Sequence, residues 1–152
     1  MDAVVEIQYV CTDYPVPTKI QFSQWVNTTL QFVQYQSVDA PELTIRIVSA
    51  TESEYLNRTW RHCAKPTNVL SFPFEKIGEI DVPLLGDIVI CASLVVDEAR
   101  SQQKSLESHW AHLVIHGTLH LLGYDHLEET QAVAMENLEI AILHDLGYPN
   151  PY

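Results

Sequence analysis

Three histidines in one short segment have the spacing of metal ligands. His116, His120 and His126 lie in the sequence HGTLHLLGYDH, at offsets of zero, four and ten residues. Since the first two are four residues apart, both imidazoles would project from the same face of a helix. Gly123 would allow the chain to reverse and bring the third imidazole towards them. The pattern predicts a metal site, and three imidazoles favour zinc over nickel, iron or manganese.

The same spacing occurs in the zinc-protease signature HExxHxxGxxH, but one position differs. Where the protease has its glutamate base, this chain has Gly117. Three protein ligands leave the fourth tetrahedral position to water, as in catalytic zinc sites, and the metal lowers the pKa of that water to roughly 7. Hydroxide is then available without a neighbouring base. We expect position 117 to lie beside this water, where a glutamate would repel an incoming phosphate.

Other side chains near the segment offer alternatives. His109 and His112 extend the stripe towards the N-terminus, so His112 and His116 form a rival ligand pair. We favour His116 with His120, because only His120 adjoins the turn that brings the third ligand back. For His109 and His112 we expect a supporting or surface position. Asp125 is expected to stabilise the turn in the first place, and otherwise to orient a ligand imidazole or act as a base.

Half of the basic residues lie in or shortly before a second segment, residues 56–75. Arg46, Arg58, Arg61 and Lys65 make up half of the 8 lysines and arginines. Residues 56–75, LNRTWRHCAKPTNVLSFPFE, predict a helix end, a basic loop and a strand. A guanidinium can clamp a phosphate at two points. An arginine of this segment that faces the metal would therefore bind phosphate, and one that does not would be solvated helix surface.

Charge and composition limit the function classes. The chain has 152 residues, enough for one domain with a buried core. Its 20 acidic and 8 basic side chains give a net charge of −12, which argues against binding nucleic acid through a broad basic face. We find no signal peptide, no apolar run long enough to span a membrane and no C-x-x-C pair. We therefore expect a cytoplasmic protein with reduced thiols and no membrane attachment.

Apolar periodicity predicts the strands that would frame these segments. Strand-like patterns occur at residues 4–10, 43–49, 69–74 and 87–93. In the second of these, Arg46 is expected to face outward. The segment between the last two, with Gly78, Pro83 and Gly86, is expected to be a connection or hairpin.

Helical spacing predicts the elements between the first strands. One helix is expected from Lys19 to about Gln34, with Thr18 as its N-cap. A second, shorter helix is expected from a capping box at Thr51 to about Arg61.

The C-terminal third is helical in pattern from Asp97 onwards. A break near Ser105 would begin the histidine helix, and Gly123 would end it. A last helix is expected over about 128–146. The residues expected to face inward on it are Val133, Leu138, Ile142 and Leu146. The order β-α-β-α-β-β-α-α predicts a single α+β domain over residues 1–152, with a small mixed sheet covered by helices.

Three segments, taken together, resemble one protein family. LNRTWR…KPTNVLSFPFE, GDIVIC and HGTLHLLGYDH are similar to the YbeY endoribonuclease family, bacterial metalloproteins of ribosomal RNA maturation. The resemblance covers most of the chain from Leu56 to the end of the last helix, in order. The histidine motif is highly specific for the family when it follows the P-T-x-V-L-S-F-P strand, whereas the first fifty residues add little.

The resemblance implies a function and a set of site residues, with the metal-binding histidine helix at a cleft. It implies a zinc-dependent, single-strand-specific endoribonuclease that acts in 16S ribosomal RNA 3′-end maturation and late-stage ribosome quality control. One zinc ion per chain would be held by His116, His120 and His126, and hydroxide on the metal would attack an RNA phosphodiester. The family's functional arginine falls on Arg61. The implied partners are single-stranded or ribosomal RNA and the ribosome or its proteins. Many relatives have Asp where this chain has Asn68, so a general base is not expected there.

Two other function classes remain open from the residues alone. A metallopeptidase or amidohydrolase would keep the histidine ligands and use Asp125 or a distant carboxylate as its base. A non-enzymatic ribosome assembly factor would use the zinc only for structure and its acidic surface to bind basic ribosomal proteins. An occupied fourth metal position would favour this last class.

Overall fold

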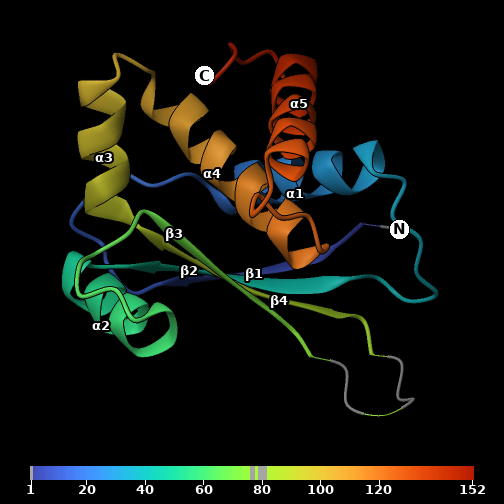
Figure 1. Ribbon diagram of the computed structural model, residues 1–152, viewed down its shortest axis with the longest axis horizontal. Coiled ribbons are helices and arrows are strands. Elements are labelled where there is room, and N and C mark those ends of the chain that lie inside the picture. Colours follow the sequence, from blue (N-terminus) through green and yellow to red (C-terminus); the bar gives the residue numbers. More distant parts are fainter. Residues whose placement is uncertain (1, 76–77, 79–81) are drawn as a thin grey trace.

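A mixed sheet forms the centre of the molecule. The computed structural model describes residues 2–75, 78 and 82–152, and within these the sheet has four strands in the order β1, β2, β4, β3 (Figure 1). They are β1 (Val4–Tyr9), β2 (Glu42–Val48), β3 (Val69–Pro73) and β4 (Leu84–Cys91). β1, β2 and β4 are parallel, and β3 pairs antiparallel with β4. The segment that follows the basic loop therefore forms an edge of the sheet.

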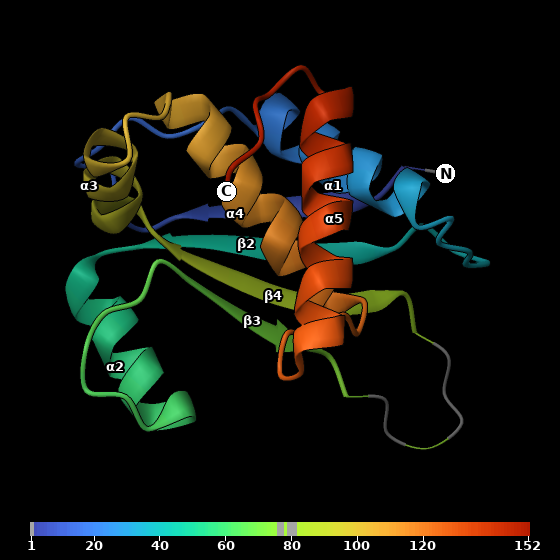
Figure 2. The same ribbon diagram turned by 45° about the horizontal axis from the view of Figure 1, so that its top comes forward.

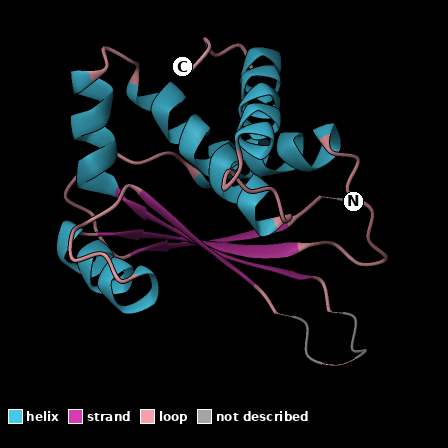
Figure 3. Cartoon of the chain, viewed as in Figure 1, coloured by secondary structure: helices cyan, strands magenta, loops and turns pink. Residues whose placement is uncertain are grey.

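Helices cover the two faces of the sheet unequally. They are α1 (Lys19–Phe32), α2 (Ala50–Arg61), α3 (Ala92–Ser101), α4 (Leu106–Leu121) and α5 (Glu129–Asp145). α1, α4 and α5 lie on one face and α2 on the other (Figures 1 and 3). The turned view of Figure 2 shows α4 crossing the sheet and α2 beside one end of the strands. The face next to α2 is therefore only partly covered.

The histidine helix α4 is the most enclosed helix of this arrangement. It packs on β3 and β4 and is contacted by α1, α3 and α5. Trp110, Val114, Ile115 and Leu119, which lie on different sides of the helix, are all buried. Buried side chains on several sides of a helix are typical of a core position. Ser105 begins it by accepting a hydrogen bond from a backbone N–H of the first turn.

Two clusters of apolar side chains lie on opposite faces of the sheet. In the larger one, Phe22 packs edge-to-face against Trp25 and Trp110, with ring centroids 5.8 and 5.9 Å apart. Such aromatic pairs contribute beyond the area that they bury. The smaller cluster, next to α2, contains Val48, Leu70 and Val89, with Leu56 and Phe72 packed against them. The larger cluster is thus the support of α4.

The predicted α+β class, with one mixed sheet and helices upon it, is confirmed. Thr18 caps α1 and Ser105 caps α4, as expected. Gly123, with φ +97°, follows α4 in the left-handed region that glycine favours. No helix among the described residues combines the length and the apolar character needed to cross a membrane.

Two predicted boundaries and the predicted element order are wrong. α2 is capped by Ser49, two residues before Thr51. The strand predicted at 87–93 stops two residues early, because Ala92 begins α3. The helical region therefore starts before Asp97, and β4 is followed by three helices rather than two. The reason is that a short, buried apolar run has the same pattern at the end of a strand and at the start of a helix.

Gly86 lies inside β4 rather than in the connection where it was expected. Its φ is +138°, and a Cβ atom there would clash with the carbonyl oxygen of Phe72 on β3. Glycine thus permits the close approach of these two strands. Of the predicted connection or hairpin itself, residues 76–77 and 79–81 lie outside the described residues.

Candidate metal centre and cleft

The structure brings the three expected metal ligands together. His116 and His120 lie in the C-terminal half of α4, and His126 lies in the turn that follows. Their nearest ring nitrogens all lie within 4.8 Å of one another, and the Nε2 atoms of His116 and His120 are 3.1 Å apart. Two nitrogen ligands of a tetrahedral zinc ion, each about 2.0–2.1 Å from it, are separated by roughly 3.3 Å. The three imidazoles therefore fit one metal ion.

A turn built around Gly123 returns His126 to the helix. The backbone N–H groups of Gly123 and Tyr124 donate to the carbonyl oxygens of His120 and Leu119, at 3.0 Å each. These bonds close the end of α4 in the manner of a glycine C-cap. Asp125 Oδ1 accepts a hydrogen bond from the backbone N–H of His126 at 2.8 Å. This contact agrees with the turn-stabilising role expected for Asp125.

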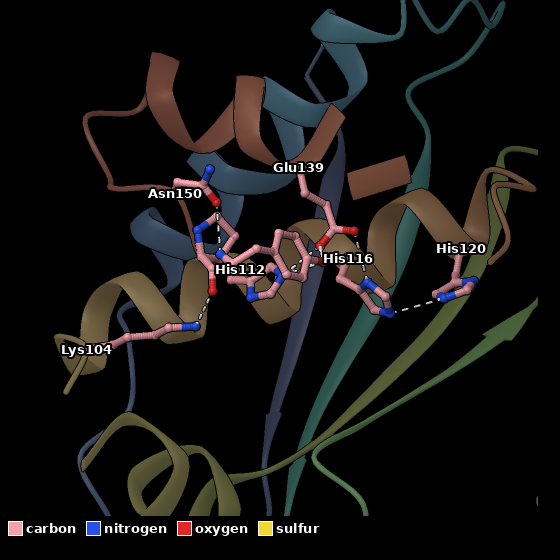
Figure 4. Close-up of polar contacts among 8 residues, drawn as sticks. Lys104, His112, His116, His120, Glu139 and Asn150 are labelled. Carbon is pink, nitrogen blue, oxygen red and sulfur yellow. Dashed lines mark hydrogen bonds and ion pairs between the residues drawn. The ribbon is translucent and has the colours of Figure 1, made fainter. Parts of the chain in front are cut away.

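A buried carboxylate from α5 braces the first ligand. Glu139 is 1% exposed, and its Oε2 lies 3.3 Å from Nδ1 of His116 (Figure 4). Its Oε1 forms a hydrogen bond of 2.6 Å with Nε2 of His112 and accepts one of 2.8 Å from the Tyr152 hydroxyl. A carboxylate on one ring nitrogen fixes the tautomer and leaves the other nitrogen free for a metal. His112 is thus a supporting residue, as expected.

The charge of Glu139 is stabilised by these partners. Burial by itself raises the pKa of the Glu139 carboxyl, but the hydrogen bonds with His112 and His116 outweigh it and hold the pKa at about 2. Burial, and then the negative charge of Glu139, raise the pKa of the Tyr152 hydroxyl. At neutral pH the carboxylate is therefore charged and the hydroxyl keeps the proton that it donates.

His120 is held in the form that binds metals. Burial lowers the pKa of His120, and the neighbouring rings of His116 and His126 lower it further. The charge of Asp125 and a hydrogen bond with the Tyr124 backbone act in the opposite direction but do not outweigh them. Metal binding requires a neutral imidazole. The lowered pKa favours the neutral ring of His120, which is the form that a metal ion requires.

Arg61 lines the same cleft as the histidines. The cleft has a volume of about 640 Å³ and is lined by the three histidines, by residues 123–127, by β3 and by Arg61. Arg61 ends α2, and its guanidinium donates to the carbonyl oxygen of Ser71 at 2.9 Å and to that of Trp60 at 3.3 Å. A guanidinium has five N–H donors. Several donors of Arg61 are therefore left for an anion in the cleft.

Gly117 does not lie beside the metal ligands' nitrogens, so the expectation for this position is wrong. A Cβ atom on Gly117 would point at the sheet and meet Cγ2 of Ile88 at 2.9 Å. The carbonyl oxygen of Gly117 accepts a hydrogen bond of 3.2 Å from the Ser71 hydroxyl on β3. Successive helix residues lie about a quarter-turn apart or more, so the neighbour of His116 faces the strands. Glycine allows α4 to sit close on β3 and β4.

His109 and Asn68 both contact the carboxylate of Glu98 and do not line the metal cleft. His109 is buried, its Nε2 lies 2.9 Å from Oε1 of Glu98, and burial lowers its pKa. The Asn68 amide donates to the same carboxylate at 3.0 Å. An aspartate at 68 would place two carboxylates against each other. Asn68 thus ties the start of β3 to α3, and its side chain is already engaged as a donor.

Glu139 is the site residue that the sequence reasoning missed. On α5 the buried residues are Met135, Glu139, Ile142 and Leu143, whereas Val133, which was expected to face inward, is 50% exposed. An acidic side chain in the middle of a buried apolar stripe is a signal for a paired charge. The expected positions of Ile142, Leu138 and Leu146 are confirmed, because Ile142 is buried and the two leucines pack against the core.

Comparisons with known proteins point to one family. The family described as Endoribonuclease YbeY matches residues 7–147. A curated protein named Endoribonuclease YbeY, from Colwellia psychrerythraea, is 51% identical over 152 residues, which are 100% of this chain and 98% of that protein. The solution structure of TM1509 from Thermotoga maritima has a TM-score of 0.58 at 24% identity and covers 95% of this chain and 92% of its own. This last likeness shows the fold alone.

Proposed function

The chain belongs to the YbeY endoribonuclease family, and from this membership we propose that it is a zinc-dependent endoribonuclease that cleaves single-stranded RNA. As a member of this family it is a nuclease, a hydrolase that acts on RNA. The observation that carries the zinc proposal is the convergence of three histidine nitrogens within 4.8 Å in a cleft that Arg61 also lines. One zinc ion per chain would be held by His116, His120 and His126.

The residues of the cleft have separate tasks in this reaction. A bound zinc ion supplies a Lewis acid for a phosphoryl oxygen and a water of lowered pKa. Glu139 keeps the His116 ring turned so that Nε2 faces the site. Arg61, anchored by the Ser71 carbonyl, directs its remaining N–H groups at the phosphate and stabilises the charge that develops there. A side chain at 117 would face Ile88 and would not reach the histidine cluster, so this position supplies no base.

The finer biological role is also a proposal. We place the activity in 16S ribosomal RNA 3′-end maturation and late-stage ribosome quality control, with a cytoplasmic location and with the ribosome or its proteins as partners. Residues 1–152 would form a single metallo-endoribonuclease domain. The support is the identity of 51% to a curated YbeY endoribonuclease along the whole chain. A net charge of −12 implies that RNA is gripped at a narrow site rather than over a broad face.

A comparison of substrates tests the proposal. We expect the zinc-loaded protein to cleave a labelled single-stranded RNA, to cleave the same strand far more slowly when it is annealed to its complement, and to leave an unstructured peptide pool intact. Cleavage of the peptides would instead support the metallopeptidase alternative. Binding of ribosomal proteins without cleavage of either substrate would support the assembly-factor alternative.

A further inference from the structure

Exposed aromatic side chains lie next to Arg61, outside the metal cleft. Trp60 is 59% exposed, and its ring meets that of Phe72 edge-to-face with centroids 6.3 Å apart. Tyr55, on the same helix, is 57% exposed. A single exposed aromatic residue needs no explanation. These three, however, line one hollow of about 530 Å³ between α2 and the sheet.

Arg61 connects this aromatic hollow with the metal cleft. Its guanidinium carbon lies 5.3 Å from the centre of the Phe72 ring, which is within cation–π range. Consecutive side chains of β3 point to opposite faces: Ser71 lines the metal cleft and Phe72 lines the aromatic hollow. A chain that leaves the metal cleft past Arg61 and over the β3 edge therefore reaches the aromatic hollow.

Charge within the hollow does not favour phosphate. The one basic residue that lines it, Arg46, is paired with Glu52 through hydrogen bonds of 2.6 and 2.9 Å. Asp87 lines the hollow as well. The phosphates of a nucleic acid would therefore gain little electrostatic binding energy in the hollow. The bases of a single-stranded nucleic acid could still bind there, because stacking on an aromatic ring needs no positive charge.

We propose that Trp60, with Phe72 packed against it, forms a stacking surface for a base of single-stranded RNA whose backbone is held at Arg61. This inference rests on the proposed endoribonuclease function and adds to it a source of affinity that suits an acidic protein. Bases in a duplex are already stacked and paired, so they are not available to the indole. The stacking surface therefore contributes to the preference for single strands.

The three tryptophans allow a direct spectroscopic test. Trp25 and Trp110 are buried, at 0% and 1% exposed, so Trp60 is the tryptophan that a bound base can reach. We expect a short, cleavage-resistant 2′-O-methyl RNA to quench tryptophan fluorescence of the zinc-loaded protein. An abasic oligonucleotide of the same length carries the phosphates without the bases and is expected to leave the fluorescence unchanged.

Two substitutions at one position provide the matched controls. Trp60→Leu removes the aromatic face but keeps an apolar side chain, and we expect RNA binding, measured by anisotropy, to weaken roughly tenfold. KM should rise while kcat changes little, and the salt dependence of binding should stay the same, since no phosphate contact is lost. Trp60→Phe keeps an aromatic ring and is expected to retain most of the affinity, but to lose the fluorescence change.

The outcomes separate this proposal from the function on which it rests. RNA binding without quenching, together with unchanged affinity in Trp60→Leu, would overturn the stacking surface and leave the nuclease proposal standing. Quenching with unchanged affinity in Trp60→Leu would also overturn it, because the contact would then contribute nothing. Failure of the wild-type protein to bind or cleave RNA would overturn both proposals.

Discussion

The two walls of the metal cleft are built in different ways. The histidine wall rests on α4, which is enclosed by other elements, and its first ligand is braced by Glu139, a carboxylate that is 1% exposed. The arginine wall rests on the last residue of α2 and on the edge strand β3. Its guanidinium is exposed and is anchored to two backbone carbonyl groups.

This difference corresponds to the ligand that we propose for each wall. A metal ion requires nitrogens at fixed distances, so its ligands need a packed support and hydrogen-bonded partners. A phosphate on a flexible strand is a larger and more variable target. Arg61 can meet it because backbone carbonyl groups hold the guanidinium without enclosing it. We therefore expect substitutions in the histidine wall to change metal binding, and substitutions in the arginine wall to change turnover.

The largest effect is expected from the ligands themselves. His116→Ala, His120→Ala and His126→Ala should each lower the zinc affinity by more than the roughly 10–100-fold typical of a residue that supports a ligand, because the site has three protein ligands. His112→Ala, which removes only a partner of Glu139, should keep most of the metal. Metal analysis of the purified variants decides this, and loss with His112→Ala but retention with His120→Ala would mean that the ligand pair is wrong.

On the arginine wall, Arg61→Ala should keep the zinc and lose about 10²–10³ in rate, as expected for one group that stabilises transition-state charge. Arg61→Lys should recover only part of the rate, because an ammonium cannot make the two-point contact. Single-turnover cleavage and zinc content should be measured on the same preparations. An unimpaired Arg61→Ala enzyme would leave this arginine as ordinary helix surface.

In the support of the histidine wall, Glu139→Gln should weaken zinc binding by about 10–100-fold. The amide keeps the shape of the side chain, but it lacks the charge that turns Nδ1–H of His116 towards it. Tyr152→Phe removes only a hydroxyl and should have a smaller effect in the same direction. Chelator-competition titrations would measure both, with the exposed Glu136→Gln on the same helix as a matched control.

The same carboxylate makes the stability of the metal-free protein depend on pH. The pKa of Glu139 is lowered from 4.5 to about 2 in the folded state. Its contribution, on the order of 3 kcal/mol, is therefore present above pH 4.5 or so and is lost as the pH falls through about 2. In denaturant unfolding, the free energy of unfolding of the wild type should exceed that of Glu139→Gln near neutral pH, and this difference should vanish in acid. A difference that does not change with pH would show that the lowered pKa of Glu139 is not its cause.

The smallest effect concerns how α4 sits on the sheet. Gly117→Ala should gain up to about 1 kcal/mol in helix propensity but push its Cβ into Ile88, so the net change should be a destabilisation of roughly 1–2 kcal/mol. Ile88→Ala removes the opposing atoms, so the double variant should lose less than the sum of the single ones. Strict additivity in thermal unfolding would mean that the two residues do not press on each other.

The histidine cluster could be predicted from the sequence, whereas the positions of Arg61 and Glu139 beside it could not. The histidine ligands are local: an offset of four on a helix and a glycine turn bring them together, so their spacing predicts the cluster. Arg61 is separated from them by more than fifty residues, and only the pairing of β3 with β4 carries it to the cleft. Glu139 meets His116 through the packing of α5 on α4, which no local pattern encodes.

At Gly117 the sequence suggested a contact with the metal site that the tertiary structure does not contain. Its place in the signature suggested a position near the metal, because spacing along a helix gives angles but does not say which side faces the sheet. Ser71 and Ile88 settle that question, and both lie on strands distant in the sequence. The α+β class, by contrast, could be predicted, because segments with the apolar periodicity of strands alternate along the chain with segments that have the periodicity of helices.

A zinc titration of the metal-free protein tests the central claim most directly, namely that the three histidines hold one catalytic metal ion. The cleavage rate of a single-stranded RNA should rise in proportion to added zinc and level off at one ion per chain, and His116→Ala should show no such rise. Full cleavage by protein shown to be metal-free, or a rate that zinc does not change, would contradict it.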